Sequence, residues 1–283
     1  MNKFNIYAFA DEASPVLKDQ IIAMKRNNLQ GIEIRNTEGV NVSDLTVEQA
    51  KKIRSELDAA GLVVGSLGSP LGKIDIEKDD FAEHLEKFKR SLEIAHILGT
   101  KKIRLFSFYM PQDKDPAIFK NEVIDRLGQF TLAAKGSGIV LCHENEKGIY
   151  GDIAERCLEI FKALPELKCV FDPANFVQSG QETLSAWEML CPYVHYMHIK
   201  DAELDGNVVP AGKGAGNLEK IISNYVANGG TDFTLEPHLT VFSGLAGLER
   251  EGERSNVGNF VYASPDEAFD VACNSLKDIL AKL

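Results

Sequence analysis

The chain has 283 residues, of which 44% are hydrophobic and 26% are charged, a composition typical of a globular protein with a sizeable core. Its 42 acidic residues outnumber its 31 basic residues and give a net charge of −11, which disfavours nucleic acid and anionic membranes as partners. The sequence shows no secretory signal, no apolar run of about 18 residues and no CxxC pair among its cysteines. We therefore expect a cytoplasmic protein with neither a nucleic-acid nor a membrane partner.

Short β-branched runs alternate with longer segments of helical period along the whole chain. In the segment after residue 80, for example, Phe81, Leu85, Phe88 and Leu92 recur at steps of three or four, which places them on one face of a helix. The expected strands cover residues 4–9, 31–35, 62–67, 102–108, 139–144, 168–172, 194–200 and 232–236.

A repeated strand–helix unit folds either as an open doubly wound sheet or as a closed barrel. The first expected strand runs into Ala10-Asp11-Glu12-Ala13 and lacks the glycine-rich loop of an open dinucleotide-binding sheet. The sequence therefore predicts an α/β protein with one domain, a (β/α)8 TIM barrel over residues 1–283. The long stretch 239–263 is expected to be a lid, a binding loop or a contact in a homo-oligomer.

Polar residues follow four consecutive strands of the expected barrel. Because a TIM barrel carries its active site at the C-terminal ends of its strands, these residues should converge at one rim. The four strand ends supply Glu144, Asp172, His198 and Glu236.

Three carboxylates and one imidazole, with no nearby arginine expected to neutralise them, would concentrate negative charge at this rim. A divalent cation is the simplest remedy, although a lone carboxylate at a strand end is more often a helix cap or a salt-bridge partner. Oxygen ligands with one nitrogen favour a single Mn²⁺, with Mg²⁺, Co²⁺ or Zn²⁺ as further possibilities.

The four strand ends read His143-Glu144-Asn145-Glu146, Asp172-Pro173-Ala174-Asn175, His198-Ile199-Lys200-Asp201 and Glu236-Pro237-His238. In this order they resemble the xylose-isomerase-like barrel superfamily, in particular its members described as sugar phosphate isomerases or epimerases. The resemblance spans essentially the whole chain. It implies that Glu144, Asp172, His198 and Glu236 bind one metal. It also implies that Glu144 and Glu236 act as an acid/base pair.

That resemblance predicts an isomerase or epimerase of a small sugar or sugar derivative. The reaction removes a proton next to a carbonyl group and passes through an enediolate. The chain departs from ketose 3-epimerases at two positions. Asn175 stands where they carry a histidine, and Leu204 stands where they carry a substrate-contacting arginine.

Further rim residues are candidates for the chemistry or for substrate contacts. Lys200 shares strand parity with His198, so it should face the barrel mouth and either stabilise an enolate or form a salt bridge. Lys213 lies in a glycine-rich segment, 210–216, that could cradle an anion or act as a gate. The expected substrate-binding residues are Glu12, Glu33, Arg35, His143, Asn175, Lys213 and His238.

Three other functions remain as alternatives. A metal-dependent lyase or dehydratase of a keto-sugar or keto-inositol would begin with the same proton abstraction. A phosphodiesterase acting on abasic DNA is disfavoured by the net charge and by the absence of histidines at the ends of the third and fourth strands. A non-catalytic sugar-binding barrel is the third alternative.

Overall fold

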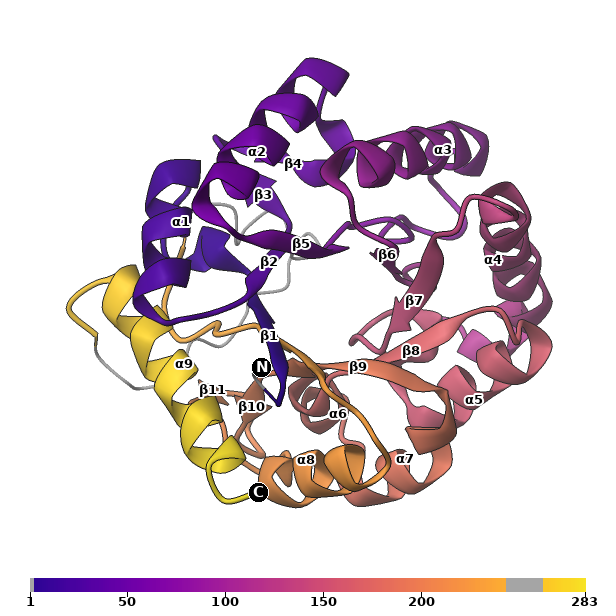
Figure 1. The fold of residues 1–283 in the computed structure, drawn as a ribbon. Helices are drawn as coiled ribbons and strands as arrows, with labels where there is room; N and C mark the ends of the chain where they lie inside the picture. The colour runs from indigo at the N-terminus through magenta and orange to yellow at the C-terminus, as the bar shows by residue number, and fades with distance from the viewer. Residues whose placement is uncertain (1–2, 243–261) are drawn as a thin grey trace.

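A computed structural model describes residues 3–242 and 262–283. Its centre is a closed barrel of eight parallel strands with helices around the outside (Figure 1). The predicted (β/α)8 barrel is therefore confirmed, and each expected run contains one barrel strand. The barrel strands are β1 (Asn5–Ala8), β2 (Gly31–Ile34), β5 (Val63–Leu67), β6 (Lys102–Leu105), β7 (Val140–Glu144), β8 (Lys168–Phe171), β9 (Val194–Ile199) and β12 (Asp232–Leu235).

The helices begin and end where local sequence signals place the boundaries. Thr46 and Gln49 form a capping box at the start of α2, and Gly99 ends α3 in the left-handed conformation. None of the described helices is long and apolar enough to span a membrane. The helices are α1 (Leu17–Arg26), α2 (Val47–Ala60), α3 (Phe81–Leu98), α4 (Lys120–Ala134), α5 (Ala154–Ala163), α6 (Pro173–Gln178), α7 (Thr183–Leu190), α8 (Leu218–Ala227) and α9 (Pro265–Leu280).

Two short antiparallel hairpins extend from the barrel. One is formed by β3 (Asn36–Thr37) and β4 (Val40–Asn41), and the other by β10 (Asp201–Ala202) and β11 (Val208–Val209). The second hairpin directly follows β9 and leads into the segment 210–216. It therefore lies next to the strand end that carries His198.

The strand order around the barrel is β1-β12-β9-β8-β7-β6-β5-β2, so the last strand closes against the first. Every barrel pairing is parallel, and in the pairing of β12 with β9 the partner of Thr234 is His198. Because all strands run the same way, their carboxyl ends meet at one rim. This topology brings the ends of β7, β8, β9 and β12 together.

The barrel interior contains a small apolar cluster separate from the core between strands and helices. It consists of Cys142, Val170 and Tyr196, all of them buried. Each of these residues lies two positions before a rim residue, at Glu144, Asp172 and His198 respectively. Since side chains alternate along a strand, this cluster forms the layer directly beneath the rim set.

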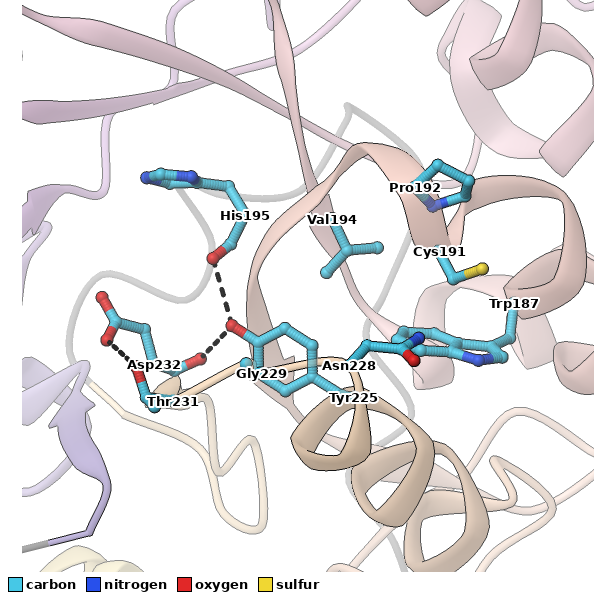
Figure 2. A pocket seen from close by; sticks show the side chains of 11 residues that line it. Trp187, Cys191, Pro192, Val194, His195, Tyr225, Asn228, Gly229, Thr231 and Asp232 are labelled. Carbon is cyan, nitrogen blue, oxygen red and sulfur yellow. Dashed lines mark hydrogen bonds between the residues drawn. The ribbon is translucent and has the colours of Figure 1, made fainter.

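The opposite end of the barrel has a hollow near the starts of β9 and β12. Trp187, Val194, Tyr225 and Asp232 are among its lining residues, and the Tyr225 hydroxyl donates to the backbone oxygens of His195 and Asp232 (Figure 2). Most of the long stretch expected to be a lid or subunit contact, residues 243–261, lies outside the described residues.

Candidate metal centre

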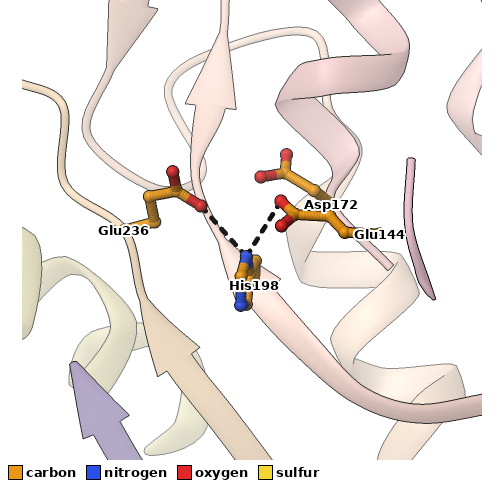
Figure 3. Close-up of side chains that lie close together, drawn as sticks. All are labelled: Glu144, Asp172, His198 and Glu236. Atoms are coloured by element: carbon orange, nitrogen blue, oxygen red, sulfur yellow. Dashed lines mark hydrogen bonds and ion pairs between the residues drawn. The ribbon is translucent and has the colours of Figure 1, made fainter. Parts of the chain in front are cut away.

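The four rim residues converge as the strand ends predict. Glu144 is the last residue of β7, Asp172 follows β8, His198 lies near the end of β9, and Glu236 follows β12. One ligand atom from each residue lies within 4.8 Å of those from the other three, and all four side chains are buried (Figure 3).

His198 presents its Nδ1 atom to the carboxylates. This atom lies 3.0 Å from Glu144 Oε1 and 3.0 Å from Glu236 Oε2. Burial alone would lower the pKa of His198, but the nearby Glu144 and Glu33 carboxylates raise it well above its ordinary value. The imidazole therefore faces concentrated negative charge on its Nδ1 side.

Two carboxylate oxygens of this set are incompletely satisfied. Asp172 Oδ2 and Glu236 Oε2 are buried and accept no hydrogen bond, although each has an ion-pair partner, Lys200 and His198 respectively. Burial raises the pKa of Asp172 to about 7, against the lowering effect of Lys200. Three oxygen donors and one nitrogen donor at such close range fit a divalent cation, so this buried cluster could bind a metal.

The expectation that no arginine lies near these carboxylates is wrong. Arg104 Nη1 lies 3.1 Å from Glu144 Oε2, and Arg35 Nη1 lies 3.7 Å from Glu236 Oε1. Both guanidinium groups are buried and reach the set from β6 and from the residue after β2. The case for a metal therefore depends on the convergence of four donor atoms and not on a lack of positive charge.

Lys200 lies on the same side of its strand as His198, as its parity indicates. Its Nζ is 3.1 Å from Asp172 Oδ2 and 3.5 Å from Glu236 Oε1. Burial opposes its charge, yet the Asp172 and Glu236 carboxylates raise the pKa of Lys200. An ammonium ion therefore stands directly beside the four candidate ligands.

Glu12, Arg35 and His238 form a second group at the rim. Arg35 donates to Glu12 and to Asp11, while the backbone amide of His238 donates to Glu12 Oε2 over 2.6 Å. Burial raises the pKa of Glu12 to about 8, and Arg35 opposes this shift. Arg35 contacts both Glu12 and Glu236, so its guanidinium group supplies the positive charge that faces these two carboxylates.

The remaining candidates occupy different positions relative to the four-residue set. Asn175 Nδ2 donates to Glu144 Oε1 over 3.3 Å, so Asn175 contacts the set. Glu33 does not pair with Arg35; it lies beneath the rim, where its Oε2 is 3.3 Å from His198 Nε2. His143 points away from the set, toward Phe161 of α5.

The backbone of the glycine-rich segment 210–216 surrounds a carboxylate of the chain itself, that of Asp201. The amides of Gly212 and Gly214 donate to Asp201 Oδ2, and the amide of Gly216 donates to Asp201 Oδ1, each over 2.9 Å. Lys213 is exposed within this segment. The glycine amides of the segment that could cradle an anion or act as a gate therefore bind a carboxylate of the chain itself.

Sequence reasoning missed several residues that contact the site. Arg104 lies inside a predicted strand, and its alternation with the apolar Ile103 and Leu105 was the available signal that it faces the barrel interior. Tyr196 and Thr234 stand two positions before His198 and Glu236, and strand parity could have identified them. Leu204 is 88% exposed, so it makes no substitute contact for the absent arginine.

The profile of the xylose isomerase-like TIM barrel family matches residues 21–243. The chain belongs to this family. No curated protein sequence matches it significantly.

Solved structures share the fold at low sequence identity. The probable 3-DHS dehydratase AsbF from Bacillus anthracis is 19% identical with a TM-score of 0.71, and the match covers 98% of this chain and 99% of that one. The 3-keto-D-glucoside 4-epimerase YcjR from E. coli is 16% identical with a TM-score of 0.70, covering 99% and 100%. The IOLI protein, described with a bound zinc atom, is 17% identical with a TM-score of 0.75, covering 98% of each chain.

Proposed function

We propose that this chain is a divalent-metal-dependent enzyme that isomerises or epimerises a small sugar or sugar derivative by proton abstraction next to a carbonyl group. One observation carries the proposal. The Glu144 and Glu236 carboxylates stand on either side of His198, and each reaches to 3.0 Å of its Nδ1 atom (Figure 3). Two carboxylates that approach one point from different strands can serve the two faces of a carbon atom bound between them.

Glu144, Asp172, His198 and Glu236 would hold the cation, with Mn²⁺ as the expected ion and Mg²⁺, Co²⁺ or Zn²⁺ as alternatives. A divalent cation supplies Lewis-acid stabilisation of the negative charge that develops on substrate oxygens.

The proton transfers belong to the chain's own carboxylates. One of Glu144 and Glu236, in its ionised form, takes the proton from the carbon, and the other, in its protonated form, donates its own proton to the opposite face in an epimerisation. Lys200 stands beside Glu236, where its ammonium group favours negative charge on a neighbouring substrate oxygen. Glu12, Arg35, Asn175 and His238 line the same rim and are the proposed hydroxyl-binding residues.

A dehydratase is the second candidate, and the position of Lys200 favours it. Its Nζ contacts both Asp172 and Glu236, so a fixed positive charge lies next to the proposed base. After proton abstraction, this charge could stabilise the oxygen of a departing hydroxyl group. The proton-abstraction step would be common to both candidates.

Proton exchange tests the proposal directly. The Mn²⁺-loaded protein and a chelator-stripped control would be incubated in D₂O with pooled ketoses, keto-phosphates and 3-keto-glycosides, and deuterium uptake would be measured by mass spectrometry. We expect metal-dependent uptake at one carbon. A recovered isomer or epimer identifies an isomerase, and loss of water identifies a dehydratase. Absence of exchange with every substrate would contradict the proposal.

A further inference from the structure

Glu33 is a buried carboxylate with three polar partners and no place at the rim. It comes from β2 and is fully buried in the layer beneath the four candidate ligands. The Tyr196 hydroxyl donates to its Oε1 over 2.9 Å, and the Thr234 hydroxyl donates to its Oε2 over 2.8 Å. The third partner is His198, whose Nε2 lies 3.3 Å from Oε2.

The His198 ring is also held by two aromatic side chains. Phe9 packs edge-on against it at a centroid distance of 5.2 Å, and Tyr196 packs similarly at 5.5 Å. These contacts fix the plane of the ring, so its two nitrogens face different surroundings. Nε2 faces Glu33, whereas Nδ1 faces Glu144 and Glu236.

We propose that Glu33 is a positioning residue that keeps a proton on His198 Nε2, so that the Nδ1 lone pair is the metal ligand. The inference rests on the metal site of the proposed function and adds the group that orients its one nitrogen ligand. A neutral imidazole that donates through one nitrogen must offer the other as an acceptor. A carboxylate that accepts this hydrogen bond also makes the imidazole a stronger ligand.

The contacts of Glu33 explain why a carboxylate can occupy this buried position. The hydroxyl groups of Tyr196 and Thr234 each donate a hydrogen bond to it, and these bonds offset part of the cost of burying its charge. A purely structural role would require only the hydroxyl groups of Tyr196 and Thr234. Such a role would leave the affinity of the folded protein for metal unchanged when Glu33 is replaced.

Metal affinity distinguishes the two roles. Dissociation constants for Mn²⁺ and Zn²⁺ would be measured by competition with a chelator for the wild type, Glu33→Gln and Glu33→Leu. We expect about 10–100-fold weaker binding in Glu33→Leu, because the second partner of a metal-bound histidine contributes on this scale. Glu33→Gln keeps an oxygen acceptor of similar shape and should lose less. Affinities equal to that of the wild type in both variants would overturn the inference.

Tyr196→Phe supplies a matched control. It removes one donor to Glu33 but leaves the Glu33–His198 contact and the aromatic packing in place, so its metal affinity should fall less than that of Glu33→Leu. An equal or larger loss in Tyr196→Phe would show that the layer as a whole, and not Glu33, determines the affinity.

A spectroscopic test needs no Glu33 variant and so does not depend on its folding. Two-bond ¹H–¹⁵N correlation spectra of the Zn²⁺-loaded wild type, with His198→Gln for assignment, report which ring nitrogen carries the proton. We expect a protonated Nε2 and a metal-bound Nδ1. Metal on Nε2 would overturn the inference. Failure of the wild type to bind any divalent ion would instead contradict the proposed function itself.

Discussion

Arg104 Nη1 lies 3.1 Å from Glu144 Oε2, and both side chains are buried. Glu144 Oε1, the other oxygen of the same carboxylate, lies 3.0 Å from His198 Nδ1. The two oxygens therefore have different surroundings, because one faces the Arg104 guanidinium and the other faces the candidate metal position. This arrangement holds the carboxylate in one orientation, and Oε1 also accepts a hydrogen bond from Asn175 Nδ2.

Glu144 and Glu236, the two proposed acid/base residues, can each be tested by substitution with glutamine, which has nearly the same shape but no charge. Glu144→Gln and Glu236→Gln should each lower turnover by at least about 10²-fold, since general acid–base catalysis contributes on this scale. The measurement is metal-dependent deuterium exchange under saturating substrate. Circular dichroism should show an unchanged fold, because neither substitution alters side-chain volume appreciably.

Glu166→Gln is the matched control for these variants, since Glu166 is exposed and precedes β8, at the opposite end of that strand from Asp172. Its turnover should equal that of the wild type. Wild-type exchange rates in Glu144→Gln or Glu236→Gln would refute the assignment of that residue.

Metal removal should lower thermal stability. A ligand at 100 times its dissociation constant stabilises the native state by about 2.7 kcal/mol, which corresponds to a melting-temperature increase of about 5 °C for a chain of this size. Differential scanning fluorimetry with Mn²⁺, Mg²⁺ or Zn²⁺ after chelator treatment measures the shift. Asp172→Asn should abolish it, and the exposed Asp278→Asn should retain it. The same shift in Asp172→Asn would argue that the ion binds elsewhere.

Asp201 should be essential for the order of the segment 210–216. Asp201→Ala removes the acceptor for three glycine amides and should cost about 2 kcal/mol or more in unfolding free energy. Gly216→Ala should have a similar effect, because its Cβ would lie 2.6 Å from Asp201 Oδ1. Urea unfolding and limited proteolysis measure the two effects. Asp205→Ala, on the neighbouring hairpin turn, is the control and should leave the segment resistant.

His143 should make stability depend on pH. Burial lowers its pKa to about 3 from an ordinary value of 6.5, so the folded protein holds a neutral ring. The unfolded chain gains a proton below pH 6.5. This contribution is therefore fully present above pH 6.5 and is lost as the pH falls toward 3. Between pH 6.5 and 5.0 the loss is about 2 kcal/mol for this residue.

His143→Leu isolates this contribution. Both ring nitrogens are buried without a hydrogen-bond partner, so leucine loses no hydrogen bond there. Urea unfolding at pH 7.5 and 5.0 should show a smaller drop in stability for His143→Leu than for the wild type. Phe161→Leu, which changes the packing beside His143, should lower stability by the same amount at both pH values. Equal pH dependence in His143→Leu and the wild type would contradict the assignment.

The fold could be predicted because its signals are local and repeated. Each strand is a short β-branched run, and helices end at glycines such as Gly61 and Gly99, which adopt the left-handed conformation. The rim set could be predicted for a related reason. Parallel topology places every strand end at the same rim, so sequence position alone indicated that Glu144 and His198 would meet.

The partners of the rim residues could not be predicted in the same way. Whether Arg35 pairs with Glu33 or with Asp11 depends on the side-chain geometry around the barrel, which strand parity does not specify. The carboxylate held by the glycine-rich segment posed the same problem, because backbone amides donate hydrogen bonds to any anion of suitable size. Asp201 occupies that position only because the β10–β11 hairpin folds back on it.

The four candidate ligands all come from the second half of the chain, whereas Glu33, Arg35 and Arg104, which contact them, come from the first half. A chain divided within the turn at Gly136 and Gly138 would leave every ligand on one fragment and these three supporting charges on the other. Tight metal binding in a mixture of the two fragments would then show that they had associated. The contacts at the centre of the barrel thus connect residues from both halves of the chain.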